Sequence, residues 1–141
     1  MCTIINPSQN SIDRSAIPSL TDVLKVNGTI ADIELINHFN LSTQGVILAA
    51  ILNFDSCITT ISLYNNDPGS NGAIALADVL KINNFITAII LGRSCIGREG
   101  IEGFVKILTI NGSVVDIIFS HNAIDNDRAR ALAVAVMDID C

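Results

Sequence analysis

Cysteine and histidine are the residues of this 141-residue chain that could bind a metal, form disulfides or act as a catalytic pair. The four cysteines are Cys2, Cys57, Cys95 and Cys141. No two of them have the C-x-x-C spacing typical of zinc sites, and the two histidines have no matching cluster around them. The sequence therefore predicts no metal site and no cofactor, and the free thiols fit a reducing compartment.

One cysteine–histidine pair has to be weighed as a nucleophile. Cys95 and His121 could lie near one another, and a thiol beside an imidazole is an arrangement used in covalent catalysis. The sequence supplies neither a third group to orient the imidazole nor a recognisable pocket, so we expect Cys95 to be a small buried hydrophobe. The segment GREG at 97–100 lacks the phosphate-loop frame G-x-x-x-x-G-K-[ST]. We expect no catalytic residues and no enzymatic activity.

Charge and hydropathy restrict the classes of partner. Fourteen acidic residues against eight basic ones give a net charge of −6, and no basic run is present, which argues against nucleic acid or an anionic membrane as the main partner. Half of the residues are hydrophobic, yet the longest apolar runs, 46–52 and 131–137, are far shorter than the roughly 18 residues of a membrane span. The first residues do not resemble a secretory signal, so the expected location is cytoplasmic.

A 28-residue period organises the chain. Segments that begin at Ile30, Ile58 and Ile86 carry isoleucine or leucine at the same offsets, and the pattern extends in both directions without an insertion. It predicts a single domain over 1–141, built from five repeats at 2–29, 30–57, 58–85, 86–113 and 114–141.

Each repeat contains two kinds of periodicity. Apolar residues at the fourth and sixth positions alternate with variable ones, which is typical of a short strand. Apolar residues at positions sixteen, nineteen, twenty, twenty-two and twenty-three form one face of a helix. Each repeat is therefore expected to be strand, turn, helix and turn, and stacking buries the faces that one repeat cannot bury alone. The leucines predicted to be fully buried are Leu48, Leu76, Leu80 and Leu108.

These positions resemble the leucine-rich repeat of the ribonuclease-inhibitor-like subtype. The frame is carried in the third repeat by Ile58, Ile61, Leu63, Asn66, Gly72, Leu76, Val79 and Leu80. The resemblance implies an α/β leucine-rich-repeat solenoid with parallel strands on the concave face, helices on the convex face and a function in protein recognition. We expect right-handed connections. In that family the ninth-position asparagine forms a hydrogen-bond ladder, from which His38 and Ser94 depart.

Residues that project from the strands are the predicted binding site for a protein or peptide. Strand side chains alternate, so variable positions beside the buried ones face outward. Tyr64 is expected to project away from the core, with its ring left open because Gly92 beside it has no side chain. The predicted partner-binding residues are Asp32, Glu34, Ile36, Ser62, Tyr64, Ile90, Arg93, Asp116, Ile118 and His121.

Two alternatives to this function remain open at the level of sequence. Outward apolar residues on the helices, namely Val46, Ile47, Ala50, Ile74 and Ala75, could mark a self-associating scaffold. The apolar last helix could serve the same purpose as an uncapped end, giving a homo-oligomer. The chain could also be a fragment of a larger leucine-rich-repeat regulator or effector.

Overall fold

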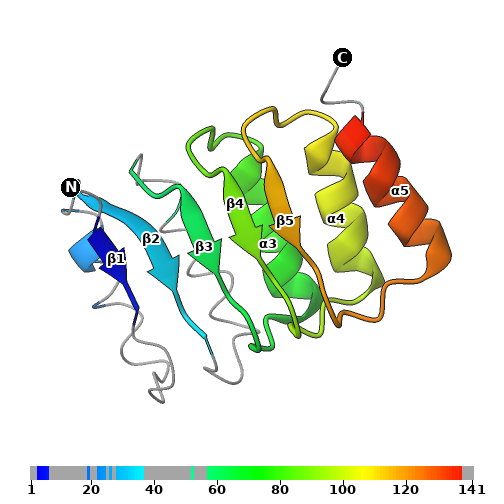
Figure 1. The fold of residues 1–141 in the computed structure, drawn as a ribbon, viewed down its shortest axis with the longest axis horizontal. Coiled ribbons are helices and arrows are strands. Elements are labelled where there is room, and N and C mark those ends of the chain that lie inside the picture. The colour runs from blue at the N-terminus through cyan, green and yellow to red at the C-terminus, as the bar shows by residue number, and fades with distance from the viewer. Residues whose placement is uncertain are drawn as a thin grey trace.

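The structure is a computed structural model that describes residues 3–6, 19, 22–24, 26, 28–36, 52 and 57–137. The strands are β1 (Thr3–Ile5), β2 (Ile30–Glu34), β3 (Thr60–Ser62), β4 (Ala88–Ile90) and β5 (Asp116–Ile118). The long helices of the described part are α3 (Gly69–Leu80), α4 (Arg98–Leu108) and α5 (Asn126–Met137). From β3 onward each strand is therefore followed by a helix (Figure 1).

All five strands belong to one parallel sheet in the order β1-β2-β3-β4-β5. The register pairs Ile33 with Ile61, Ile61 with Ile89, and Ile89 with Ile117. Each partner lies 28 residues further along the chain, so equivalent side chains form rows across the sheet. This register decides which residues are neighbours on either face of the sheet.

Helices α3, α4 and α5 cover one face of the sheet, and the opposite face of the described strands is uncovered (Figure 1). The core lies between the two layers. Leu76, Leu80 and Leu108 are 2%, 1% and 2% exposed, which confirms their predicted burial. Leu48 lies outside the described residues.

Small residues let the first two of these helices approach closely. A Cβ added to Gly100 would lie 2.8 Å from the Cβ of Ala73, closer than side chains can approach. The distance between two helix axes depends on the side chains at their contact, so small residues here bring the axes of α3 and α4 closer together. The described residues form a two-layer α/β domain, which replaces the expected solenoid with concave and convex faces.

Buried polar side chains tie the turns together at both ends of the strands. At the carboxyl ends, Asn66 donates to the carbonyl of Leu35, and Asn122 donates to the carbonyl of Leu91. Between them the Ser94 hydroxyl lies 3.0 Å from the carbonyl oxygen of Leu63, at the same 31-residue separation. Serine therefore continues the row that it was expected to interrupt; His38 lies outside the described residues.

A second row runs along the amino ends of the strands. The amide of Asn83 donates to the Leu52 carbonyl at 2.8 Å, and the amide of Asn111 donates to the Leu80 carbonyl at 2.6 Å. The side-chain oxygen of Asn83 also accepts the backbone N–H groups of Phe85 and Ile86. Each of these asparagines links its own turn to the preceding 28-residue unit.

Candidate protein-binding surface

The uncovered face of the five strands and of the turns that follow them is called here the open sheet face. It contains all ten predicted partner-binding residues, but their exposure differs. Asp116, Ile118, Arg93 and His121 are exposed, with Ile118 at 39%. Five are half-buried: Asp32, Glu34, Ile36, Tyr64 and Ile90. Ser62 is only 4% exposed, so it offers a partner little surface.

The register decides which of these residues lie together. Ile90 pairs with Ile118 across β4 and β5, which places two apolar side chains side by side. Glu34 is paired with Ser62, and Ser62 with Ile90, in the same row. Asp32 and Asp116 also share a row, but the strand residues Thr60 and Ala88 separate them. The face therefore has an apolar centre between separated acidic side chains.

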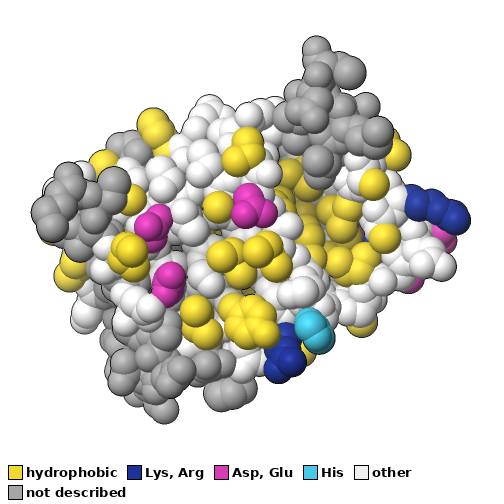
Figure 2. All heavy atoms as spheres, viewed as in Figure 1, with side chains coloured by type: hydrophobic (Ala, Val, Ile, Leu, Met, Phe, Trp, Pro, Cys, Tyr) yellow, Lys and Arg dark blue, Asp and Glu magenta, His cyan; other side chains and the backbone are white. Residues whose placement is uncertain are grey.

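Charges on the open sheet face are separated along the strand direction. Asp32 and Asp116 lie on strands, whereas Arg93 and His121 lie in the turns that follow β4 and β5. Both turn residues have left-handed backbones, with φ of 53° and 61°, and the Arg93 N–H donates to the Ser120 carbonyl at 2.8 Å. Over the strands, Figure 2 shows acidic side chains apart from the basic ones, with hydrophobic side chains between them.

Tyr64 is arranged differently from the expectation that its ring projects freely. A Cβ added to Gly92 would lie 2.8 Å from two carbons of the tyrosine ring and 2.7 Å from the Ser120 hydroxyl oxygen. The ring therefore occupies the space that glycine leaves empty, instead of being left open by it. One side of the ring packs on the sheet, and Tyr64 remains half-buried.

Gly92→Ala is expected to displace the Tyr64 ring and to cost roughly 1 kcal/mol of stability, because overpacking forces neighbouring side chains to move. The chain contains one tyrosine and no tryptophan, so its intrinsic fluorescence reports on Tyr64 alone. The measurement is tyrosine emission and its quenching by acrylamide, together with urea unfolding.

Gly103→Ala is the matched control for this substitution, because its added Cβ would meet its nearest neighbours at 3.6 to 3.8 Å, which is ordinary contact. It should leave tyrosine emission unchanged. Equal emission and quenching in Gly92→Ala and the parent protein would show that the ring does not lie over Gly92.

The two thiols in the described part of the chain, Cys57 and Cys95, do not form a recognisable reactive site. Cys95 is exposed with φ of 47°, so the expectation of a buried hydrophobe is wrong; the buried residue of that turn is Ile96, at 3%. Cys57 is half-buried and its Sγ lies 3.1 Å from the carbonyl oxygen of Gly28. Within the described part of the chain, no group of three His, Cys, Asp or Glu side chains could hold a metal ion. Cys2 and Cys141 fall outside it.

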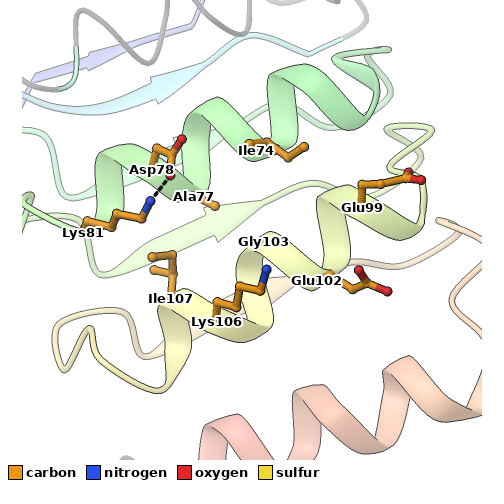
Figure 3. A pocket seen from close by; sticks show the side chains of 9 residues that line it. All are labelled: Ile74, Ala77, Asp78, Lys81, Glu99, Glu102, Gly103, Lys106 and Ile107. Atoms are coloured by element: carbon orange, nitrogen blue, oxygen red, sulfur yellow. Dashed lines mark hydrogen bonds and ion pairs between the residues drawn. The ribbon is translucent and has the colours of Figure 1, made fainter.

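A groove of about 340 Å³ lies on the other side of the molecule, between α3 and α4 (Figure 3). Ala77 and Gly103 contribute small side chains to it, while two lysines and three carboxylates surround it. The sequence did not indicate this groove, because it depends on how closely two helices pack. Its lining residues include neither histidine nor cysteine, and two of its charges, Asp78 and Lys81, form an ion pair with each other.

The resolved pKa shifts belong to helix ends and not to the open sheet face. The Arg98 side chain donates a hydrogen bond to Glu102 at 2.9 Å, and it lowers the pKa of that carboxyl. The backbone N–H of Arg128 donates to Asp125 at 3.0 Å and lowers the pKa of Asp125. Asp125 is thus the amino-terminal cap of α5. These pKa shifts arise from contacts that stabilise α4 and α5, and they indicate no catalytic acid or base.

No protein-family model and no curated protein matches this sequence. Solved structures do match its fold. The structure "Leiomodin-1 Actin-Binding Site 2 (ABS2)" aligns with a TM-score of 0.81 and 16% identity, over 98% of this chain and 80% of that one. The tropomodulin C-terminal domain of Caenorhabditis elegans aligns with a TM-score of 0.81 and 11% identity, over 99% of this chain and 84% of that one. At these identities the matches concern the fold alone.

These matches correct the assignment to the leucine-rich repeat, and with it the ribonuclease-inhibitor-like solenoid. The fold is the compact α/β fold of the tropomodulin and leiomodin domains. The physical reason for the error is that a 28-residue period predicts how strand and helix alternate, whereas the shape of the array depends on packing between helices. The period does not specify how closely α3 and α4 pack, which in the structure is set where Gly100 meets Ala73.

Proposed function

We propose that this chain is a non-catalytic protein-binding domain whose partner contacts the open sheet face. The observation that carries the proposal is the uncovered apolar centre between separated charges. Ile90 and Ile118 lie side by side, and Tyr64 packs over Gly92 near them. Interfaces commonly combine an apolar core with a polar rim, and tyrosine is frequent among the residues that contribute most to binding.

Charge separation specifies the kind of segment that fits. A partner with basic residues towards Asp32 and Asp116, and an acidic residue towards Arg93, would match the face. Five strands spaced about 4.8 Å apart span roughly 20 Å, which is the length of about 13 residues of helix. An amphipathic helix laid across the strands is therefore a suitable partner segment. Rim charges of this kind mainly affect association rate and salt dependence.

Actin is the first protein to test, because the leiomodin-1 structure that shares this fold is of an actin-binding site. That likeness concerns the fold alone, so binding of actin by this chain is a proposal. The same holds for the absence of enzymatic activity. None of the described helices is long and apolar enough to cross a membrane. A cytoplasmic location stays a prediction.

Tyr64→Ala is expected to weaken a partner of this face by about tenfold or more, since an aromatic residue at the centre of an interface commonly contributes about 2 kcal/mol. The measurement is co-sedimentation with filamentous actin and titration of monomeric actin. The same variants are measured against peptides selected on the parent protein from a displayed library of helical sequences. Glu34→Ala and Arg93→Ala are expected to change the salt dependence more than the affinity.

The control is Val134→Ala, which removes an apolar side chain that is 58% exposed on α5, away from the open sheet face. It should leave the affinity unchanged. Failure to bind actin would reject actin while leaving the surface to be tested with the peptides. If every selected peptide bound the Tyr64→Ala, Glu34→Ala, Arg93→Ala variant as tightly as the parent protein, the open sheet face would not be the binding surface.

A further inference from the structure

Large apolar side chains also project from the turns that lead from the helices into the next strands. Ile82 and Ile110 are 69% and 70% exposed, and they occupy the same position of the third and fourth 28-residue units. Phe85 and Val115 in the same turns are 52% and 82% exposed. These four residues are called here the turn-edge row. The turns after α3 and α4 lie next to each other at one edge of the molecule, at the top of Figure 1.

The second row of buried asparagines fixes the direction of these side chains. Asn83 and Asn111, which directly follow Ile82 and Ile110, are only 6% and 4% exposed. The Asn111 amide lies 3.1 Å from the Asn83 carbonyl oxygen, so the two turns are joined. With each asparagine held inside, the preceding isoleucine is held outside. The exposure of the turn-edge row is therefore a property of ordered turns.

A structural role at the helix ends does not account for this exposure. An apolar residue just past a helix often packs back on the last helical turn. Ile82 and Ile110 remain about 70% exposed, so little of either side chain is used in that way. The four side chains expose apolar area on the order of 500 Å², which is within the range for the largest patch of a typical monomer.

The turn edge is also poor in charge, although the chain as a whole carries −6. Residues 82–87 and 109–115 include no Asp, Glu, Lys or Arg. The nearest charges before residue 82 are Lys81 and Asp78, which form an ion pair. Two copies of an acidic chain repel each other through most of their surfaces, and this repulsion is smallest where the facing surfaces are neutral.

We infer that the turn-edge row is a self-association surface and that its occupant is the turn-edge row of a second copy of this chain. Ile82 and Ile110 occupy equivalent positions of two adjacent turns, and the same spacing recurs in a second copy turned about a two-fold axis. The apolar side chains of one row can then pack between those of the other. Two such rows bury on the order of 1,000 Å² together, below the standard size of a stable interface, so the dimer is weak and reversible.

The test is sedimentation velocity of the whole chain from low micromolar to near-millimolar concentration, at low and high salt. A concentration-dependent dimer is expected, and added salt should strengthen it or leave it unchanged because screening reduces the repulsion of the net charge. The Ile82→Lys, Ile110→Lys variant should remain monomeric at every concentration. Both substituted residues are exposed, and circular dichroism checks that the variant folds.

Ile4→Lys is the matched control, since Ile4 is 57% exposed and lies on β1 in the sheet, away from the turn edge. It should dimerise like the parent protein. A parent protein that stays monomeric throughout, or a Lys variant that still dimerises, would overturn the inference. Binding to phosphatidylcholine vesicles is measured as well. If the parent protein stays monomeric and binds these vesicles through Ile82 and Ile110, the turn-edge row contacts lipid and the inference is wrong. Binding of a partner at the open sheet face is measured separately, so either proposal can fail alone.

Discussion

Phe104→Ala should lower the free energy of unfolding by about 3 to 5 kcal/mol, the range for removing a fully buried aromatic ring. Phe104 has no exposed surface, and its ring meets that of Phe119 edge-on, with centroids 5.1 Å apart and an interplanar angle of 69°. Equivalent positions of the neighbouring units hold leucine, at Leu76 and Leu132.

Two further variants distinguish the cost of creating a cavity at Phe104 from the cost of losing its contact with the Phe119 ring. Phe104→Leu restores the residue type of the neighbouring units, so it should cost less, on the order of 1 kcal/mol. Phe119→Ala should cost less than Phe104→Ala, because Phe119 is only partly buried and removal of its ring leaves less enclosed space. Urea unfolding measures all three. A loss below about 1 kcal/mol for Phe104→Ala would mean that the ring is not in the core.

The buried residues of each 28-residue unit could be predicted from the sequence, because the same positions are apolar in successive units. Leu80 and Leu108 occupy equivalent positions and are both buried, and so is Leu76, one helical turn before Leu80. Periodicity works here because a strand or helix face that is buried in one unit must be buried in the next one stacked on it. The same argument cannot identify a family, since the arrangement of the layers also depends on helix packing.

Contacts between units explain what the sequence did not predict. Tyr64 and Gly92 belong to different strands, so the packing of the ring over the glycine follows from the register and not from either residue alone. Cys95 looked apolar and small, but its turn is left-handed and directs Ile96 inward in its place. The rows of asparagine and the exposed isoleucines beside them also required knowledge of which turns are neighbours.

Asn111→Ala should lower the free energy of unfolding by about 3 kcal/mol, because a buried polar group left without its partner costs about 1 to 3 kcal/mol and this change leaves several. The Asn111 amide donates to the carbonyls of Leu80 and Asn83 at 2.6 and 3.1 Å. Its oxygen accepts the N–H groups of Ser113 and Val114 at 2.9 and 3.0 Å. One side chain therefore joins the end of α3, two turns and the start of the last strand segment.

Asn84→Ala is the control, because Asn84 is exposed in the equivalent turn and its loss should change stability by no more than about 0.5 kcal/mol. Asn111→Asp keeps the acceptor oxygen of the side chain but replaces the donating NH₂ group by a second oxygen. That oxygen faces the carbonyls of Leu80 and Asn83, so the variant should be no more stable than Asn111→Ala. Amide hydrogen exchange at Ser113 and Val114 gives a local readout, and it should accelerate in Asn111→Ala more than in Asn111→Asp. Equal stability losses in Asn111→Ala and Asn84→Ala would show that the buried row does not hold the repeats together.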